Sequence, residues 1–145
     1  MLSCSKFAAL ALFVAAGFLY AGAAQAREKA AKVLAKGEFH NADKTGKGTA
    51  IIYQLANGKR VLRLRDFAVD NGPDLHVRLI AADDAKDTTS VAKADHVELG
   101  KLKGNKGNQN YALPADVNLR KYKVVSIWCN RFSVNFAAAP LKAVK

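Results

Sequence analysis

A single cysteine, Cys129, has the most reactive side chain in the body of this sequence. It lies in the stretch Ser-Ile-Trp-Cys-Asn-Arg-Phe at positions 126–132, directly after the only tryptophan, Trp128. The other cysteine, Cys4, belongs to an apolar leader. In an oxidising compartment an odd cysteine indicates a free reactive thiol, a thiol that pairs with another molecule, or a ligand. The simpler interpretation is a small apolar core residue, since free cysteines are among the most buried side chains.

Histidine is the second residue type that could join such chemistry, and the chain has three: His40, His76 and His96. A histidine together with Cys129 could bind haem iron or a copper ion. No histidine pair has the spacing of metal ligands. There is no C-x-x-C-H motif, so a haem would be noncovalent, and no histidine or methionine follows Cys129 as it would in a blue-copper site. An ordinary surface histidine is the simpler interpretation of each.

Motifs of the common hydrolases, such as G-x-S-x-G and H-E-x-x-H, do not occur in the sequence. The glycine pairs within 46–48 and 104–107 resemble phosphate-binding loops. Neither is followed by a helical pattern, so we interpret both as turns. The sequence therefore does not predict a stand-alone enzyme.

The first 26 residues have the layout of a secretory signal peptide. A single basic residue, Lys6, precedes the apolar run 7–20, and Ala24-Gln25-Ala26 forms a small-residue cleavage site. The run is shorter than the roughly 20 apolar residues of a membrane span, although an uncleaved anchor is the alternative. We expect a secreted, periplasmic protein whose mature chain begins at Arg27 and has no transmembrane segment.

Basic residues outnumber acidic ones by 23 to 12, which gives a formal net charge of +11. We expect no nucleic-acid partner, because an exported protein seldom meets one and no recognition-helix or RNP pattern is present. An anionic envelope component or an acidic partner protein is the natural counterpart, and solubility is the simpler explanation of the charge. The candidate binding residues lie in the densest basic runs and beside the cysteine: Lys101, Lys103, Lys106, Arg120, Lys121, Lys123 and Arg131.

Short alternating runs of polar and apolar residues, separated by Gly, Asn, Asp and Pro, fill the chain after residue 37. The dipeptide Asn57-Gly58 predicts a hairpin, and a long polar loop is expected at 81–95. The pattern predicts an all-β antiparallel sandwich, with a barrel-like alternative. We expect strands at 49–55, 60–67, 75–80, 96–102, 109–113, 123–129 and 132–137.

We expect one domain, at residues 37–142, without internal repeats. The preceding segment, 27–36, is rich in Ala and Lys and predicts a short helix or an arm. Residues 143–145 would form a tail.

Period-two alternation along 123–129 separates two sets of side chains. One face holds Val125, Ile127 and Cys129, and the other holds Val124, Ser126 and Trp128. Cys129 ends the run beside Arg131, so we expect a semi-exposed thiol whose thiolate is favoured by the arginine and opposed by burial. Trp128 is interpreted as a core residue on the opposite face, or as a wall against which a cofactor stacks.

The order and spacing of several motifs resemble one family. Two lie upstream, Gly48-Thr49-Ala50 and Gly72-Pro73-Asp74-Leu75, and two lie downstream, Leu102-Lys103-Gly104-x-x-Gly107-x-Gln109-x-Tyr111 and Ile127-Trp128-Cys129-x-x-Phe132. Together they resemble a DM13 domain over residues 36–142. The resemblance implies an extracytoplasmic β-sandwich proposed for electron transfer or redox chemistry, together with a redox partner protein.

The resemblance also implies that Cys129 is the centre of this chemistry. It would act as a bare thiol, oxidised through a sulfenate or a mixed disulfide, or as the ligand of a group such as noncovalent haem. Trp128 and His76 are the other candidate cofactor-binding residues, and a protein without any cofactor stays open. Members often carry a histidine just before the G-x-G-T-A turn. Here Asp43-Lys44-Thr45 stands there, with His40 further upstream, which weakens a haem-ligand role.

A cofactor-free binding module is the alternative function. In that case the basic residues would dock on an anionic envelope component or a partner protein. Loss of the Cys129 thiol would abolish the redox function and spare the binding function, whereas salt at about 0.5 M would weaken binding through exposed charges.

Overall fold

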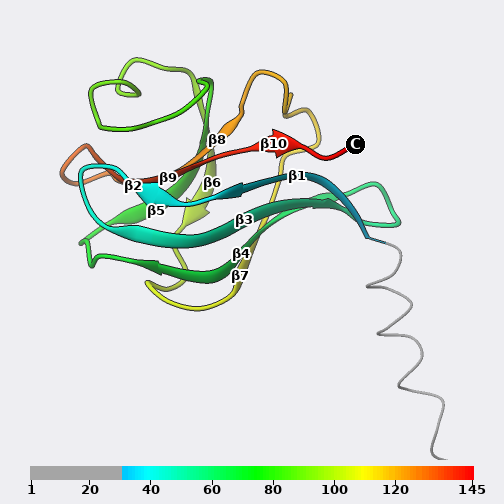
Figure 1. The fold of residues 1–145 in the computed structure, drawn as a ribbon, viewed down its shortest axis with the longest axis horizontal. Helices are drawn as coiled ribbons and strands as arrows, with labels where there is room; N and C mark the ends of the chain where they lie inside the picture. Colours follow the sequence, from blue (N-terminus) through cyan, green and yellow to red (C-terminus); the bar gives the residue numbers. More distant parts are fainter. Residues whose placement is uncertain (1–30) are drawn as a thin grey trace, which may run out of the picture.

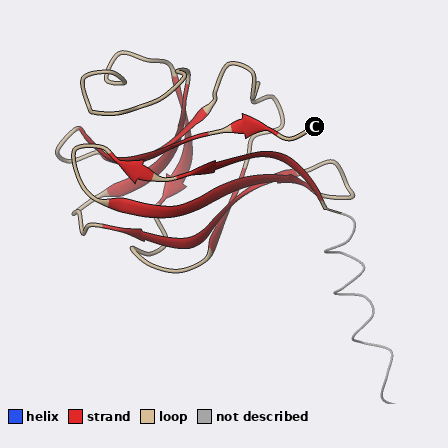
Figure 2. Cartoon of the chain, viewed as in Figure 1, coloured by secondary structure: helices blue, strands red, loops and turns tan. Residues whose placement is uncertain are grey.

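Two antiparallel five-stranded sheets face each other in residues 31–145, which are the part of the chain that the computed structural model describes (Figures 1 and 2). Sheet A has the strand order β10-β1-β3-β4-β7, and sheet B has the order β2-β9-β8-β5-β6. The strands are β1 (Lys32–Glu38), β2 (His40–Asn41), β3 (Gly46–Gln54), β4 (Arg60–Val69), β5 (Leu75–Ile80), β6 (His96–Lys101), β7 (Gln109–Ala112), β8 (Val124–Cys129), β9 (Val134–Pro140) and β10 (Lys142–Ala143). The predicted all-β sandwich is confirmed, and the two sheets do not close into a barrel.

The predicted signal peptide, residues 1–26, lies outside the described residues, as do residues 27–30 of the predicted arm. Within residues 31–145 there is no helix long and apolar enough to cross a membrane.

The short helix or arm predicted for 27–36 is contradicted from residue 32 onward, where a strand begins. Residues 32–36 form most of strand β1, which pairs with β3 on one side and with β10 on the other. Ala35 is buried, and Leu34 packs against the main core. Backbone pairing on both sides and this burial outweigh the helix propensity of the Ala and Lys residues. The predicted tail also begins in a strand, since Ala143 pairs with Ala35.

The predicted hairpin over 49–55 and 60–67 is present as the β3–β4 pair. The turn is closed by hydrogen bonds from the Leu55 amide to the Lys59 carbonyl, 2.7 Å, and from the Gly58 amide to the Leu55 carbonyl, 2.9 Å. Gly58 has a φ of 84° and is the residue of the turn that requires glycine. Asn57, the residue before it, has a negative φ. The loop is therefore not the two-residue turn in which both central residues have a positive φ.

Gly46 and Gly48 belong to strand β3 and not to a turn, which corrects the prediction. The β3–β4 register shifts between Lys47 and Thr49, and Gly48 takes a φ of 117° at this bulge. A Cβ on Gly48 would lie 2.7 Å from the Phe67 Cα. The glycine spacing therefore serves the close approach of two backbones.

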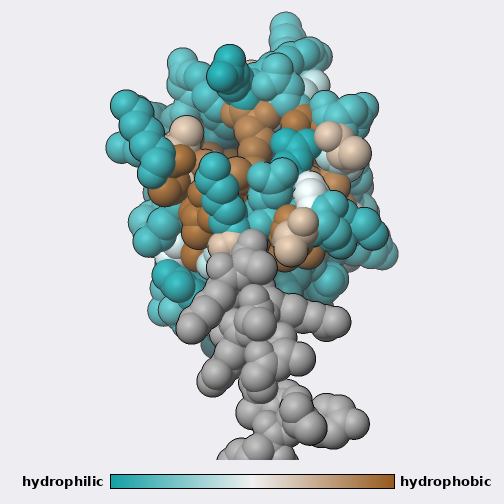
Figure 3. Space-filling view, turned by 90° about the vertical axis from the view of Figure 1, so that its right-hand side faces the viewer, coloured by the Kyte–Doolittle hydropathy of each residue, from teal (hydrophilic) through white to brown (hydrophobic). Residues whose placement is uncertain are grey.

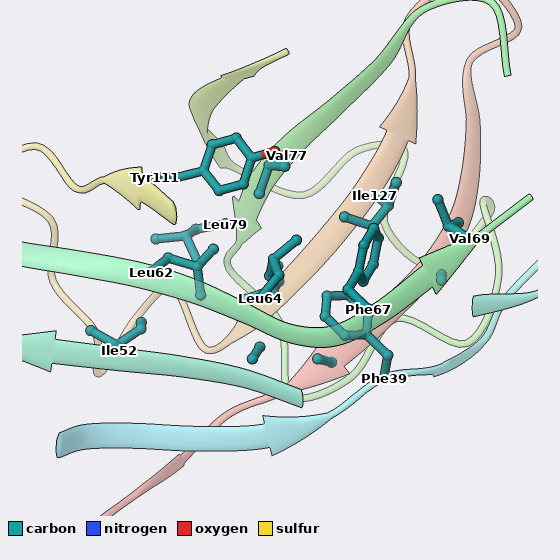
Figure 4. Packing of buried hydrophobic residues seen from close by; sticks show 14 of the residues in the cluster. Phe39, Ile52, Leu62, Leu64, Phe67, Val69, Val77, Leu79, Tyr111 and Ile127 are labelled. Atoms are coloured by element: carbon teal, nitrogen blue, oxygen red, sulfur yellow. The ribbon is translucent and has the colours of Figure 1, made fainter. Parts of the chain in front are cut away.

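Apolar side chains from both sheets form the main core (Figure 4). Leu62 and Leu64 of β4 meet Val77 and Leu79 of β5, and all four are fully buried. The Phe39 and Phe67 rings pack edge to face with centroids 5.1 Å apart. Figure 3 views the end of the sandwich at which β10 lies, where apolar side chains show between hydrophilic ones. A hollow lined in part by Leu34, Leu119 and Leu141 shows that the core is only partly covered at this end.

A second, smaller core lies on the outer face of sheet B, under the 81–95 loop. This loop is the green lobe at the top left of Figure 1. Ala85 and Val91 of the loop are buried against Ile80, Val124 and Trp128. The segment was predicted as a polar loop, and it contains no strand. In addition, its two buried side chains cover the outer face of sheet B.

Asn135 binds the 81–95 loop to sheet B. Its side chain is fully buried and donates to the Ala85 carbonyl at 3.1 Å, while its Oδ1 accepts from the Ser126 hydroxyl at 2.8 Å. The Asn135 amide donates to the Thr88 Oγ1 at 2.9 Å, and Thr88 in turn donates to Asp43. A buried polar network of this kind is stable because every member has a partner.

We predict that Asn135→Ala lowers the free energy of unfolding by about 2–4 kcal/mol, because it leaves the Ser126 hydroxyl and the Ala85 carbonyl buried without a partner. Denaturant unfolding monitored by circular dichroism measures the loss. Asn110→Ala removes the same atoms from an exposed site and should change stability by less than about 0.5 kcal/mol. An equal effect of the two substitutions would contradict the role given to the buried network.

Candidate functional site

Cys129 is fully buried between the two sheets and forms no disulfide. It belongs to the main core, together with Val125 and Ile127 of the same strand, so the predicted face is correct. The predicted semi-exposure is wrong. The thiol lies in the last cross-strand row of sheet B, between Leu75 and Val134, and is buried among the apolar side chains of the main core.

Two segments lie beyond this row, the 130–133 turn and the loop before β5. The Asn130 amide donates to the Asp74 carbonyl at 2.9 Å, which joins the two segments just past Cys129. Residues 130–133 are all exposed, and 60% of Phe132 is accessible to solvent. Phe132 was expected in a strand and instead lies in the turn, where Ser133 has a φ of 52°. A fully buried thiol thus stands one residue away from an exposed turn.

Trp128 faces the opposite side of sheet B, as predicted, and packs in the smaller core with 8% of its surface exposed. The Arg78 guanidinium lies over the indole ring, 5.0 Å from its centroid. Arg78 also donates to Asn130 Oδ1 at 2.7 Å and to Glu98 Oε2 at 3.1 Å. The tryptophan is therefore held from both sides, by the 81–95 loop and by a fixed arginine.

His76 shares the outer face with Arg78, in agreement with the predicted alternation. Both of its ring nitrogens face carboxylates: Nε2 lies 2.8 Å from Asp74 Oδ1, and Nδ1 contacts Glu98. Only 15% of the His76 side chain is exposed. The two carboxylates were not singled out from the sequence, since one lies beside His76 only through the β5–β6 pairing.

The three candidate cofactor-binding residues are separated by sheet B. Trp128 and His76 are cross-strand partners on the outer face, whereas Cys129 points into the core. One bound group cannot touch all three without passing through the backbone of the sheet. Cys129 belongs to an apolar cluster, and no histidine is among the buried residues of 31–145. These residues therefore do not fit a haem held jointly by Cys129, Trp128 and His76.

The other two histidines lie apart from the cysteine. His96 begins β6 and is exposed. His40, in β2, pairs with Ala138 and bonds the cover loop, with Nε2 2.6 Å from Asp84 Oδ1 and Nδ1 2.7 Å from the Asn41 carbonyl. In residues 31–145, no three His, Cys, Asp or Glu side chains are arranged to hold a metal ion.

The pKa of His40 is raised. Burial acts to lower it, but the Asn41 carbonyl and the Asp84 carboxylate together outweigh burial. The pKa of Asp84 is lowered, because hydrogen bonds from His40 and from the Ala85 amide outweigh its own burial. The two shifts stabilise the charged pair, and with it the contact between β2 and the cover loop.

The predicted basic binding residues are spread over strand β6 and several loops, and several are already paired. Lys121 lies 3.0 Å from Asp95, Lys123 bonds Asp83, and Lys101 lies 3.9 Å from Asp74. Lys103 bonds the Asn110 carbonyl and lies over the Tyr111 ring, 5.1 Å from its centroid. Arg120 lines one pocket together with Lys121, Lys123 and the aspartates that pair with them. Lys106 bridges to β4, and Arg131 is exposed in the 130–133 turn, so neither belongs to that pocket.

The fold and the site together define a small β-sandwich with one buried, unpaired thiol beneath an exposed hairpin turn. Residues 38–141 match the family described as Electron transfer DM13. The match spans most of the chain, and the protein belongs to the DM13 family. No curated protein and no solved structure matches it. The motif resemblance in the sequence is thereby confirmed, and the family description supports a redox role in general.

We predict that Cys129 in the native protein reacts with iodoacetamide about 100-fold or more slowly than in the unfolded chain, because reaction requires opening of the surrounding structure. Intact-mass measurement against time, with and without denaturant, gives the two rates. Equal rates would contradict the burial of the thiol.

We predict that His40→Gln destabilises the protein more at pH 5.5 than at pH 8. The raised pKa of His40 contributes stability below about pH 6.5, and this contribution is lost as the pH rises through the folded-state pKa. Because the side chain is about one-third exposed, the effect should stay below about 1 kcal/mol. Thermal melts at both pH values measure it. His96→Gln is the control and should show no such difference.

Proposed function

We propose that this protein is an extracytoplasmic redox domain whose redox-active group is the Cys129 thiol. The observation that supports this most is the position of Cys129: a sole unpaired thiol in residues 31–145, in the last row of sheet B and one residue from an exposed turn. The family's description as an electron-transfer domain supports the redox role. The apolar leader supports export, to the periplasm.

Local opening is the step that makes the thiol reachable. Only the terminal pair Cys129–Val134 and the turn after it need to separate, and such strand ends open at a small fraction of the global unfolding free energy. The turn is held chiefly by the Asn130–Asp74 backbone bond and by the Arg78–Asn130 contact. Burial in the closed state shields the thiol from overoxidation, because access limits that reaction.

Thiol–disulfide exchange is the chemistry that one cysteine can perform here. The Cys129 thiol loses its proton, and the thiolate attacks one sulfur of a disulfide on the partner. A bond forms between Cys129 and that sulfur, the partner's S–S bond breaks, and the second sulfur leaves as a thiolate that takes up a proton. The described chain offers no second cysteine, so resolution of the mixed disulfide requires a partner thiol.

A prosthetic group ligated by Cys129 is the other form of this proposal. It would require the core around the thiol to rearrange, because the packed side chains there are apolar and the candidate partners face away. The bare thiol needs only the local opening, and we therefore favour it. The visible absorption spectrum before and after dithionite separates the two forms. A Soret band that is lost in Cys129→Ala would show that Cys129 is a haem ligand and would contradict the bare-thiol form.

We predict that the native protein accepts one glutathionyl group from oxidised glutathione, that reduction removes it, and that Cys129→Ala accepts none. Intact-mass measurement of quenched samples gives the rate. If opening is local, Val134→Ala should speed the reaction about tenfold beyond what its effect on global stability explains.

The matched control for this experiment is Val117→Ala, which truncates a buried valine in the loop that precedes the start of β8. It should speed modification only as far as it destabilises the whole domain. If native Cys129 stays unmodified while the unfolded chain reacts readily, the cysteine is a core residue and the proposal fails.

A cofactor-free binding module is the second candidate function, and the observation that favours it is the large positive charge. It would use an anionic envelope component or an acidic protein as ligand. The predicted residues Lys101, Lys121 and Lys123 are engaged by carboxylates, so the surface for such binding needs to be sought elsewhere on the molecule.

A further inference from the structure

The charges of the protein are divided unequally between the two sheets. The strands of sheet A carry seven lysines and arginines against two carboxylates. The strands of sheet B, together with the 81–95 loop, carry four basic residues against five acidic ones. Among the strands the positive excess therefore lies in sheet A, and the other connecting segments carry the rest of the basic excess.

Ion pairing adds to this difference in charge between the two sheets. All seven ion pairs in residues 31–145 involve sheet B, the 81–95 loop or segments beside them, and none includes a residue of a sheet A strand. On β4, Arg63 bonds only the Asn110 amide oxygen, at 3.3 Å. Arg65, two residues further on, is exposed and has no acceptor in the described part of the chain. These guanidinium groups keep their donors available.

Alternation along β4 directs the two arginines to the same surface. Leu62 and Leu64 are fully buried in the core, so Arg63 and Arg65 lie on the outer face of sheet A. The 81–95 loop packs on the outer face of sheet B and not on this one. A groove there is lined by Ala31, Tyr53, Leu55, Val61, Arg63, Arg65 and Asn110. We call it the sheet A groove.

The sheet A groove combines free cations with apolar contact area. Leu55 is 38% exposed, and Tyr53 and Val61 are half-buried beside the two arginines. Arginine forks bind carboxylates in a bidentate manner, and tyrosine and arginine are enriched at protein interfaces. A partner that fits must offer carboxylates next to apolar side chains. An acidic protein surface has both, whereas an anionic polysaccharide has no apolar side chains.

We propose that the sheet A groove is the docking surface for an acidic partner protein, with Arg63 and Arg65 as the anchoring residues. This inference rests on the proposed function in one respect, because we take the docking partner to be the redox partner protein. The partner would bind the face opposite to the one that carries Trp128 and His76. The unpaired cations would steer a negatively charged partner toward this side and orient it before contact.

The test uses a glutamate–tyrosine copolymer as probe, because it presents carboxylates beside aromatic side chains. We expect the purified protein to bind it, and binding to weaken about tenfold in about 0.5 M NaCl. Arg63→Glu/Arg65→Glu should weaken binding at least about tenfold at low salt, and Arg63→Gln/Arg65→Gln should weaken it less. Fluorescence anisotropy measures binding, and circular dichroism checks that each variant is folded.

The matched control is Lys44→Glu/Lys93→Glu, which changes the net charge equally at two exposed lysines that lie outside sheet A. It should leave binding within about twofold of the wild type, because rim charges far from a site contribute little. Equal weakening by both charge reversals would overturn the proposal. So would a failure of the wild type to bind the copolymer, or its preference for phosphatidylglycerol vesicles over the copolymer.

Cys129→Ala separates this inference from the proposed function. It should bind the copolymer as the wild type does, because the thiol lies in the core and not in the groove. Loss of glutathione exchange with binding retained would contradict the redox function alone. Retained exchange without binding would contradict the docking surface alone.

Discussion

Strand β8 contributes side chains to two separate cores, and all six of its residues are buried. Val125, Ile127 and Cys129 fill the space between the sheets, while Val124 and Trp128 pack beneath the 81–95 loop. A shift of one residue in the pairing of β8 would exchange the cysteine and the tryptophan between these environments. The loop must therefore stay in place for the strand to keep its register, which explains why buried Asn135 and the His40–Asp84 pair both bind it.

The pairing register of β8 also determines which chemical groups lie on each face of sheet B. The core face gives Cys129 an apolar surrounding without a polar partner. The outer face holds the polar groups, with Arg78 fixed over Trp128 and His76 set between two carboxylates. Adjacent residues in the sequence thus have unlike surroundings, and a role for the tryptophan does not follow from a role for the cysteine. Any coupling between them passes through the strand backbone.

Much of the fold could be predicted because its signals are local. Alternation in 60–67 and 75–80, the Asn57-Gly58 turn and the apolar run before Cys129 each depend on neighbouring residues, and the corresponding strands lie close to their expected bounds. The failures concern contacts between distant segments. Strand β1 depends on pairing with β10 at the other end of the chain, and the burial of Cys129 depends on the packing of both sheets in the main core.

The candidate site was predictable to the same extent. The face of Cys129 followed from period-two alternation, whereas its accessibility depended on a turn whose shape includes a positive φ at Ser133. The pairing of Lys121 and Lys123 with aspartates of the 81–95 loop could not be foreseen, because these partners are 26 and 40 residues away. The alternating arginines of β4 predicted its solvent-exposed face. That the neighbouring strands carry no carboxylates could be recognised only from the order of strands in the sheet.

The shortness of two edge strands has a consequence for self-association. Sheet A ends at β10 and sheet B ends at β2, and each of these strands has only two residues. An exposed strand edge is a template on which further copies can add in succession. Here two of the four edge strands are that short, and at a third the β5–β6 register shifts beside Gly100, which has a φ of 130°. These features leave fewer regular backbone groups on which a further strand could add.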